Sequence, residues 1–253
     1  MVVANPATIG ADLVKDFSLY RTKQTLMSDM ERARALRQIN KIPNDAEKFM
    51  LKGMLDCQCF RKEDCIRNFD TSLRIGYDEL TVENFVTASI FLNDFSFAKS
   101  ILEKYSKNSN SIGLLKQAAY VYYLSLDIEE LAATLKTLQK LQAEDLEFFE
   151  EIVSMYVENH ERMVDVGITE GAIKEYGQLV DTIFSAKPYM RILSQEASFC
   201  SREQVLSVVY FVGSNENVTE DDIIDAKIEL AFTAVEKGLS PNIVVTFMSG
   251  LEE

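Results

Sequence analysis

Three cysteines lie close together in the stretch CQCFRKEDC, at positions 57, 59 and 65. Cysteine thiolates at short spacings are common ligands of structural zinc. On a helix, however, Cys57 and Cys59 point about 200° apart, so they do not face one ion together. Cys65 falls at a repeat position, described below, where a small apolar side chain is expected. Because Cys200 is isolated, the sequence predicts no metal site.

Residues with the types and spacings of known catalytic motifs are scarce. His160 is the only histidine, and no second histidine stands four residues on, as a zincin helix requires. The chain has no G-x-S-x-G elbow and no phosphate-binding lysine loop. The acidic pairs Glu129–Glu130 and Glu150–Glu151 fall on expected helix faces or ends, where carboxylates are usually solvated. We therefore predict that the protein is not an enzyme; the alternative needs a pocket that gathers His160, Cys200 or Ser249 with a carboxylate.

The loop Gly213–Asn217 precedes an expected helix, a place where backbone N–H groups can bind phosphate. Glu220, Asp221 and Asp222 fill the first turn of that helix. Their carboxylates would repel an anion from the N–H groups. The sequence thus predicts no nucleotide site and no cofactor.

The charge of the chain limits its partners. It carries 26 Lys and Arg against 40 Asp and Glu, for a net charge of -14. This balance argues against general nucleic-acid binding and against docking on an anionic membrane. No basic segment followed by a long apolar core stands near the N-terminus, and no apolar run reaches the length of a membrane span. With only four cysteines, a cytoplasmic protein is expected.

Helical hairpins recur along the chain at a spacing of 33 residues. The stretch Leu115–Leu141 predicts two helices joined by a turn at Asp127. The stretch Phe91–Tyr105 aligns with Leu124–Leu138 without gaps, and one further step back reaches a third hairpin. The positions where paired helices would cross are Gly53, Val86 and Ala119 in the first helices, and Cys65, Ala98 and Leu131 in the second helices.

This pattern of a small residue, a tyrosine, an acidic turn and a leucine stripe resembles a degenerate tetratricopeptide repeat. The resemblance covers Asn44–Phe184. It departs from the family in its period, which is 33 rather than the usual 34 residues, and in the missing closing proline. The alternative is an irregular helical bundle whose hairpins have equal lengths. The preceding segment, Ala11–Ile42, is expected to be a helical cap.

The resemblance implies a concave groove lined by the first helix of each hairpin. That groove would be apolar and aromatic, which suits an amphipathic helix or a hydrophobic extended segment of a partner. The alternative is that the C-terminal domain or the N-terminal helix of the chain itself fills the groove. The groove residues implied are Met50, Met54, Gln58, Thr87, Phe91, Lys116, Tyr120, Tyr123, Phe149 and Tyr156.

The composition changes after Lys187. Gln204–Val212 and Asn242–Phe247 are rich in β-branched and aromatic residues and predict two strands. Thr219 predicts the start of a helix between them, and Tyr189–Gln195 is a candidate third strand. The residues expected to form the buried stripe of that helix are Ile224, Ile228, Ala231, Val235 and Leu239.

The fold class predicted is mainly α, with helical hairpins stacked as a tetratricopeptide-like array and followed by a small C-terminal α/β (βαβ) domain. The predicted domains are a cap at residues 1–43, the repeats at 44–187 and the α/β domain at 188–253. The predicted function is non-catalytic protein binding, as an adaptor, chaperone or inhibitor that holds an apolar segment of a partner protein. The alternative is a ligand- or peptide-responsive regulator that forms a homodimer through its C-terminal domain.

Overall fold

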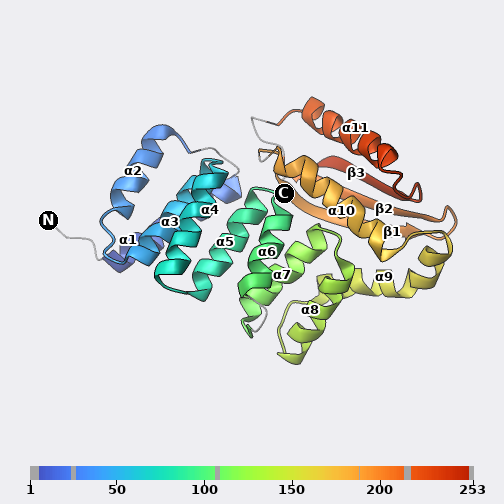
Figure 1. The fold of residues 1–253 in the computed structure, drawn as a ribbon, viewed down its shortest axis with the longest axis horizontal. Coiled ribbons are helices and arrows are strands. Elements are labelled where there is room, and N and C mark those ends of the chain that lie inside the picture. Colours follow the sequence, from blue (N-terminus) through green and yellow to red (C-terminus); the bar gives the residue numbers. More distant parts are fainter. Residues whose placement is uncertain (1–5, 24–26, 106–108, 188, 214–217, 251–253) are drawn as a thin grey trace. The chain divides into compact units, whose positions relative to one another are not determined.

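The computed structural model describes residues 6–23, 27–105, 109–187, 189–213 and 218–250. Across these ranges the chain forms eleven helices and three strands (Figure 1). The prediction of a mainly helical protein with a small sheet near the C-terminal end is thereby confirmed. By its internal contacts the chain divides into two compact units, Met1–Leu92 and Asn93–Glu253. The second unit contains the sheet as well as several helices. The domain boundaries predicted after residues 43 and 187 remain predictions.

The first unit contains α1 (Pro6–Lys23), α2 (Asp29–Ile39), α3 (Asp45–Gln58), α4 (Lys62–Ile75) and α5 (Glu79–Phe91). The second unit contains α6 (Phe95–Tyr105), α7 (Ile112–Leu124), α8 (Ile128–Lys140), α9 (Glu147–Asp165), α10 (Glu170–Ser185), β1 (Ile192–Cys200), β2 (Val205–Gly213), α11 (Glu220–Glu236) and β3 (Ile243–Gly250).

The same turn conformation follows α3, α5 and α7. Phe60, Asn93 and Leu126 all have positive φ, at 52°, 53° and 56°, and they are spaced 33 residues apart. At Phe60 and Leu126 the hydrogen bonds also agree. The turn residue donates to the carbonyl three residues back, and the next N–H donates to the carbonyl five residues back. This is a Schellman motif formed without glycine. The 33-residue spacing seen in the sequence is therefore a spacing of backbone turns.

In the first unit, a glycine lets α3 pack closely against α4. A Cβ placed on Gly53 would lie 2.6 Å from the ring of Phe69, and that ring stacks on Phe85 of α5 at 4.7 Å. The α2 helix is joined to α3 by an ion pair of 3.2 Å between Arg32 and Asp56. Gly53 thus stands where the sequence placed a helix crossing.

The sheet of the second unit has the order β1–β2–β3, with β1 antiparallel and β3 parallel to β2. Alternate residues of β2 are buried, and Tyr210 pairs with Gln195 of β1 and with Phe247 of β3. The ring of Phe184 on α10 packs edge-on against Phe247 at 4.8 Å, which places α10 over this face of the sheet (Figure 1). The candidate third strand was placed too early, because β1 begins at Ile192 and continues to Cys200.

The stripe predicted to be buried on α11 is wrong. The residues that α11 buries are Ile223, Ala226, Leu230 and Ala234, whereas Ile224, Ile228, Ala231 and Val235 are exposed and Leu239 is half-buried. The helix has apolar residues on two adjacent sides, and the side that packs on α10 and β3 is the one with two alanines. The two alanines let this side of α11 approach its neighbours closely, and the adjacent apolar side faces outward.

Gly177 of α10 permits a close contact with the turn between α7 and α8. A Cβ at this position would overlap the backbone carbonyl of Ser125. Because that overlap is with backbone, it cannot be relieved by rotating a side chain. We predict that Gly177→Ala lowers the free energy of unfolding by about 3 kcal/mol, measured by urea denaturation followed by circular dichroism. Gly171→Ala, at the start of the same helix, meets only Thr169 Oγ1 at 3.8 Å and should leave stability almost unchanged. Equal effects of the two changes would contradict the contact.

Candidate functional site

The groove residues of the first unit are mostly inside the protein. Met50, Met54 and Gln58 of α3 are buried, and so is Phe91 of α5, whereas Thr87 is half-buried. The Met50 sulfur accepts a hydrogen bond from the Thr81 hydroxyl at 3.5 Å. These residues form contacts of the core, and only Thr87 leaves a substantial part of its side chain accessible.

In the second unit the groove residues meet the first strand of the sheet. Tyr123, Phe149 and Tyr156 are buried, and the rings of Tyr123 and Phe149 lie 6.4 Å apart. Tyr120 is half-buried. Lys116 is half-exposed and lies 3.8 Å from Asp145.

Tyr123 binds both backbone groups of one strand residue. Its hydroxyl donates to the carbonyl of Gln195 and accepts from the N–H of Gln195 at 3.0 Å. The side-chain amide of Gln195 donates in turn to the carbonyl of Tyr123 at 2.6 Å. Tyr120 extends the contact by donating to the carbonyl of Leu193 at 2.9 Å. A partner could reach Tyr123 only by displacing β1, so the chain itself occupies this part of the implied groove.

Burial raises the pKa of Tyr123 far above its ordinary value. A phenol is protonated at physiological pH even at its ordinary pKa, so the hydroxyl of Tyr123 can donate to Gln195. A second side chain, Asn93, holds the start of the same strand. Its amide donates to the carbonyl of Met190 at 2.7 Å and accepts from the N–H of Ile192 at 3.2 Å. Side chains of the helical region thus replace a neighbouring strand along the edge of β1.

We predict that Tyr123→Phe destabilises the docked strand, because the buried N–H and C=O of Gln195 lose their partner. The expected loss is about 2 kcal/mol in the free energy of unfolding. The measurement is hydrogen exchange at the backbone amide of Gln195. Its exchange rate should increase in the variant, because the N–H group has lost its acceptor. Tyr122→Phe, on the same helix beside Lys99, is the matched control and should leave that amide unchanged. Unchanged exchange in the Tyr123 variant would contradict the role of its hydroxyl.

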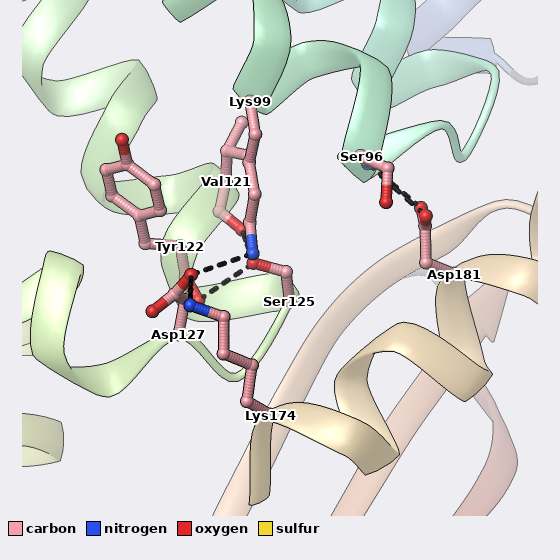
Figure 2. Close-up of polar contacts among 8 residues, drawn as sticks. All are labelled: Ser96, Lys99, Val121, Tyr122, Ser125, Asp127, Lys174 and Asp181. Carbon is pink, nitrogen blue, oxygen red and sulfur yellow. Dashed lines mark hydrogen bonds and ion pairs between the residues drawn. The ribbon is translucent and has the colours of Figure 1, made fainter. Parts of the chain in front are cut away.

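A buried carboxylate joins three helices at the turn between α7 and α8. Asp127 is 5% exposed and forms ion pairs with Lys99 of α6 at 3.0 Å and with Lys174 of α10 at 2.9 Å (Figure 2). Burial alone would raise the pKa of Asp127, but the two lysines outweigh it and lower the pKa. The same pairing raises the pKa of Lys174. The cluster is structural, because both lysines are engaged by the carboxylate.

We predict that Asp127→Asn lowers the free energy of unfolding by about 2 kcal/mol at neutral pH. This value is below that of a fully buried pair, because Lys174 is 47% exposed and partly screened by water. Since the folded pKa of Asp127 is lowered, its contribution is present above the unfolded pKa of about 3.9 and is lost as the pH falls through the folded pKa. The difference between wild type and variant should therefore be constant above about pH 5 and shrink below about pH 4.

The measurement is urea denaturation at a series of pH values. Asp145→Asn is the control, because Asp145 is 91% exposed and its ion pair with Lys116 is long. A difference between wild type and Asp127→Asn that did not depend on pH would show that the carboxylate charge contributes nothing.

A second buried carboxylate caps a helix that is distant in sequence. Asp181 of α10 accepts a hydrogen bond from the N–H group of Phe95 at 2.6 Å, at the start of α6. It accepts a second from the N–H group of Ser96 at 3.3 Å (Figure 2). Burial raises the pKa of Asp181 even though these N–H groups oppose the shift. The carboxylate satisfies N–H groups that an isolated helix leaves unpaired.

A cleft lies between α8 and α9. It has a volume of about 970 Å³. Its apolar floor comes from α8, α9, α10 and the loop between α9 and α10, whereas its rim carries three Lys and Arg residues, four Glu residues and His160. Val157 of α9 lines it and is 68% exposed. The floor residues are Ile128, Tyr156, Met163, Ile168 and Ile173.

Of the implied groove residues, Tyr156 is the one that lines this cleft. The sequence pattern did not identify the other residues of the cleft. Its α8 side includes small residues, Ala132 and Ala133, which do not stand out as a binding surface. The available signal was Val153 and Val157, which stand among the charged residues of α9. Burial raises the pKa of Tyr156, and its hydroxyl has no hydrogen-bond partner among the described residues.

Two of the four cysteines lie in the core of the first unit. Cys57 and Cys65 are buried, and the thiol of Cys57 donates to the carbonyl of Ala88 at 3.5 Å. The neighbouring Cys57 thiol, together with burial, raises the pKa of Cys65 well above its ordinary value. Within the described ranges, no three His, Cys, Asp or Glu side chains are grouped so that they could hold a metal ion.

The residues considered for catalysis stand on different elements. His160 is exposed on α9 and lines the cleft, whereas Cys200 ends β1 and Ser249 belongs to β3. The lining of the cleft includes neither Cys200 nor Ser249. Of the loop considered for phosphate binding, residues 214–217 lie outside the described residues.

Among the helices described, none is long and apolar enough to span a membrane. In comparisons with known proteins, no protein family, no curated protein and no solved structure matches the chain.

Proposed function

We propose that the chain is a non-catalytic protein-interaction module, which holds an apolar segment of a partner in the cleft between α8 and α9. The observation that carries the proposal is the cleft itself, with its buried apolar floor and charged rim. In this proposal the helices form a tetratricopeptide-like array and the segment β2–α11–β3 is a βαβ unit.

The size and chemistry of the cleft favour a peptide segment. Its volume of about 970 Å³ is at the upper end of the range for small-molecule pockets. Ile128, Met163 and Ile173 offer apolar contacts, which suit the residues that an amphipathic helix presents at i and i+4. The rim carries Lys136, Lys140 and Arg162 beside four glutamates, so it can pair with polar flanks of either sign.

The recurring turn supports the repeat interpretation. Phe60, Asn93 and Leu126 repeat one backbone conformation at 33-residue intervals, as expected for hairpins of one repeating type. The burial of Tyr123 and Phe149 against the chain itself is the reason to place the partner at the α8–α9 cleft instead of the implied groove.

The test is photo-crosslinking in native lysate with benzoylphenylalanine at one of two positions on α9. Val157 lines the cleft, whereas Val164 is also exposed but lies outside the lining. We expect a discrete protein adduct from position 157 and none from position 164. Ala133→Glu, on the facing helix, should reduce the adduct about tenfold by placing a charge in the cleft. Identical adducts from both positions, or no adduct from position 157, would refute the proposal.

A further inference from the structure

Helix α11 presents a row of large apolar side chains to solvent. Ile224, Ile228, Phe232 and Val235 are 47%, 48%, 69% and 80% exposed. Their spacing of four, four and three residues places them on one face of the helix. The buried face of α11, which packs against α10 and β3, consists of Ile223, Ala226, Leu230 and Ala234. The exposed row, named here the α11 stripe, is therefore not needed to attach the helix to the protein.

A row of carboxylates runs beside the α11 stripe. Asp221, Asp225 and Glu229 each stand three residues before Ile224, Ile228 and Phe232, so they form the adjacent ridge of the helix. All three are exposed. Glu229 forms an ion pair with Lys187 at 2.5 Å, whereas Asp221 and Asp225 have no ion pair recorded within the described ranges. Lys227 is the single basic residue among the residues of α11.

We propose that the α11 stripe is a second docking surface, which binds a cationic amphipathic helix of a partner protein. Such a helix carries an apolar face against the stripe and Lys or Arg residues against the acidic ridge. Charge complementarity is what selects this occupant, since the stripe alone would accept any apolar segment.

The same charges disfavour the other occupants. A second copy of the chain would bring its own Asp221, Asp225 and Glu229 towards this ridge, and like charges across an interface oppose association. An anionic membrane surface would be repelled in the same way. The surface differs from the proposed cleft, because no residue of α11 lines that cleft.

The test uses a fluorescein-labelled 18-residue helix of leucine and lysine, added to the full chain at 0.15 M salt and followed by fluorescence anisotropy. The matched control peptide has glutamate in place of lysine. We expect the lysine peptide to bind at least about tenfold more tightly than the glutamate peptide. Ile228→Ser with Phe232→Ser should weaken binding of the lysine peptide by about tenfold or more. Asp221→Asn with Asp225→Asn should weaken it by a smaller factor and reduce its salt dependence.

Val157→Ser is the control on the protein side, since Val157 is exposed on α9 and lines the cleft. It should leave binding of the lysine peptide unchanged. Circular dichroism of each variant shows whether it is folded, and all the substituted side chains are exposed. Binding that is lost in Val157→Ser but kept in the α11 variants would move the site to the cleft and overturn the proposal. Equal binding of both peptides, or sedimentation showing a dimer that the α11 variants abolish, would overturn it as well.

Discussion

The second unit depends on the pairing of Tyr123 with the backbone of Gln195. The edge strand of a sheet carries N–H and C=O groups that must find partners if they are buried. Here a phenol from α7 supplies both partners to one strand residue, while Asn93 supplies them near the start of the strand. With these groups satisfied, β1 can lie against helices, and Tyr210 of the next strand also donates to the carbonyl of Leu124. The helices and the sheet of this unit are therefore held together by specific hydrogen bonds as well as by apolar contacts.

Local features of the fold could be predicted from the sequence more readily than its tertiary contacts. β-Branched and aromatic residues marked β2 at Gln204–Val212, within one residue of its observed ends. The 33-residue spacing anticipated turns that recur at Phe60, Asn93 and Leu126. The face that α11 buries could not be predicted in the same way. Periodicity identifies large apolar residues, but α11 has them on two adjacent sides, and the side that packs is the one that includes Ala226 and Ala234.

The candidate site shows the same limit. A rule taken from repeat architecture placed Tyr120 and Tyr123 in a groove for a partner, but such a rule cannot tell a partner from the chain's own strand. Only the tertiary structure reveals that Leu193 and Gln195 arrive at those hydroxyls. The α8–α9 cleft could not be predicted because its walls include alanines and single valines, which carry little signal individually.

The bonds of Asn93 to Met190 and Ile192 join residues 97 and 99 positions apart. Closing so long a loop is slow compared with forming neighbouring helices. On a ribosome, which synthesises the chain from its N-terminal end, helices α6 to α9 emerge well before β1 does. During that interval the hydroxyls of Tyr120 and Tyr123 have no strand to bind, and the aromatic face of α7 is open. The nascent chain therefore passes through a stage in which it displays a surface that the finished protein keeps covered, and that stage is when chaperones would have most to bind.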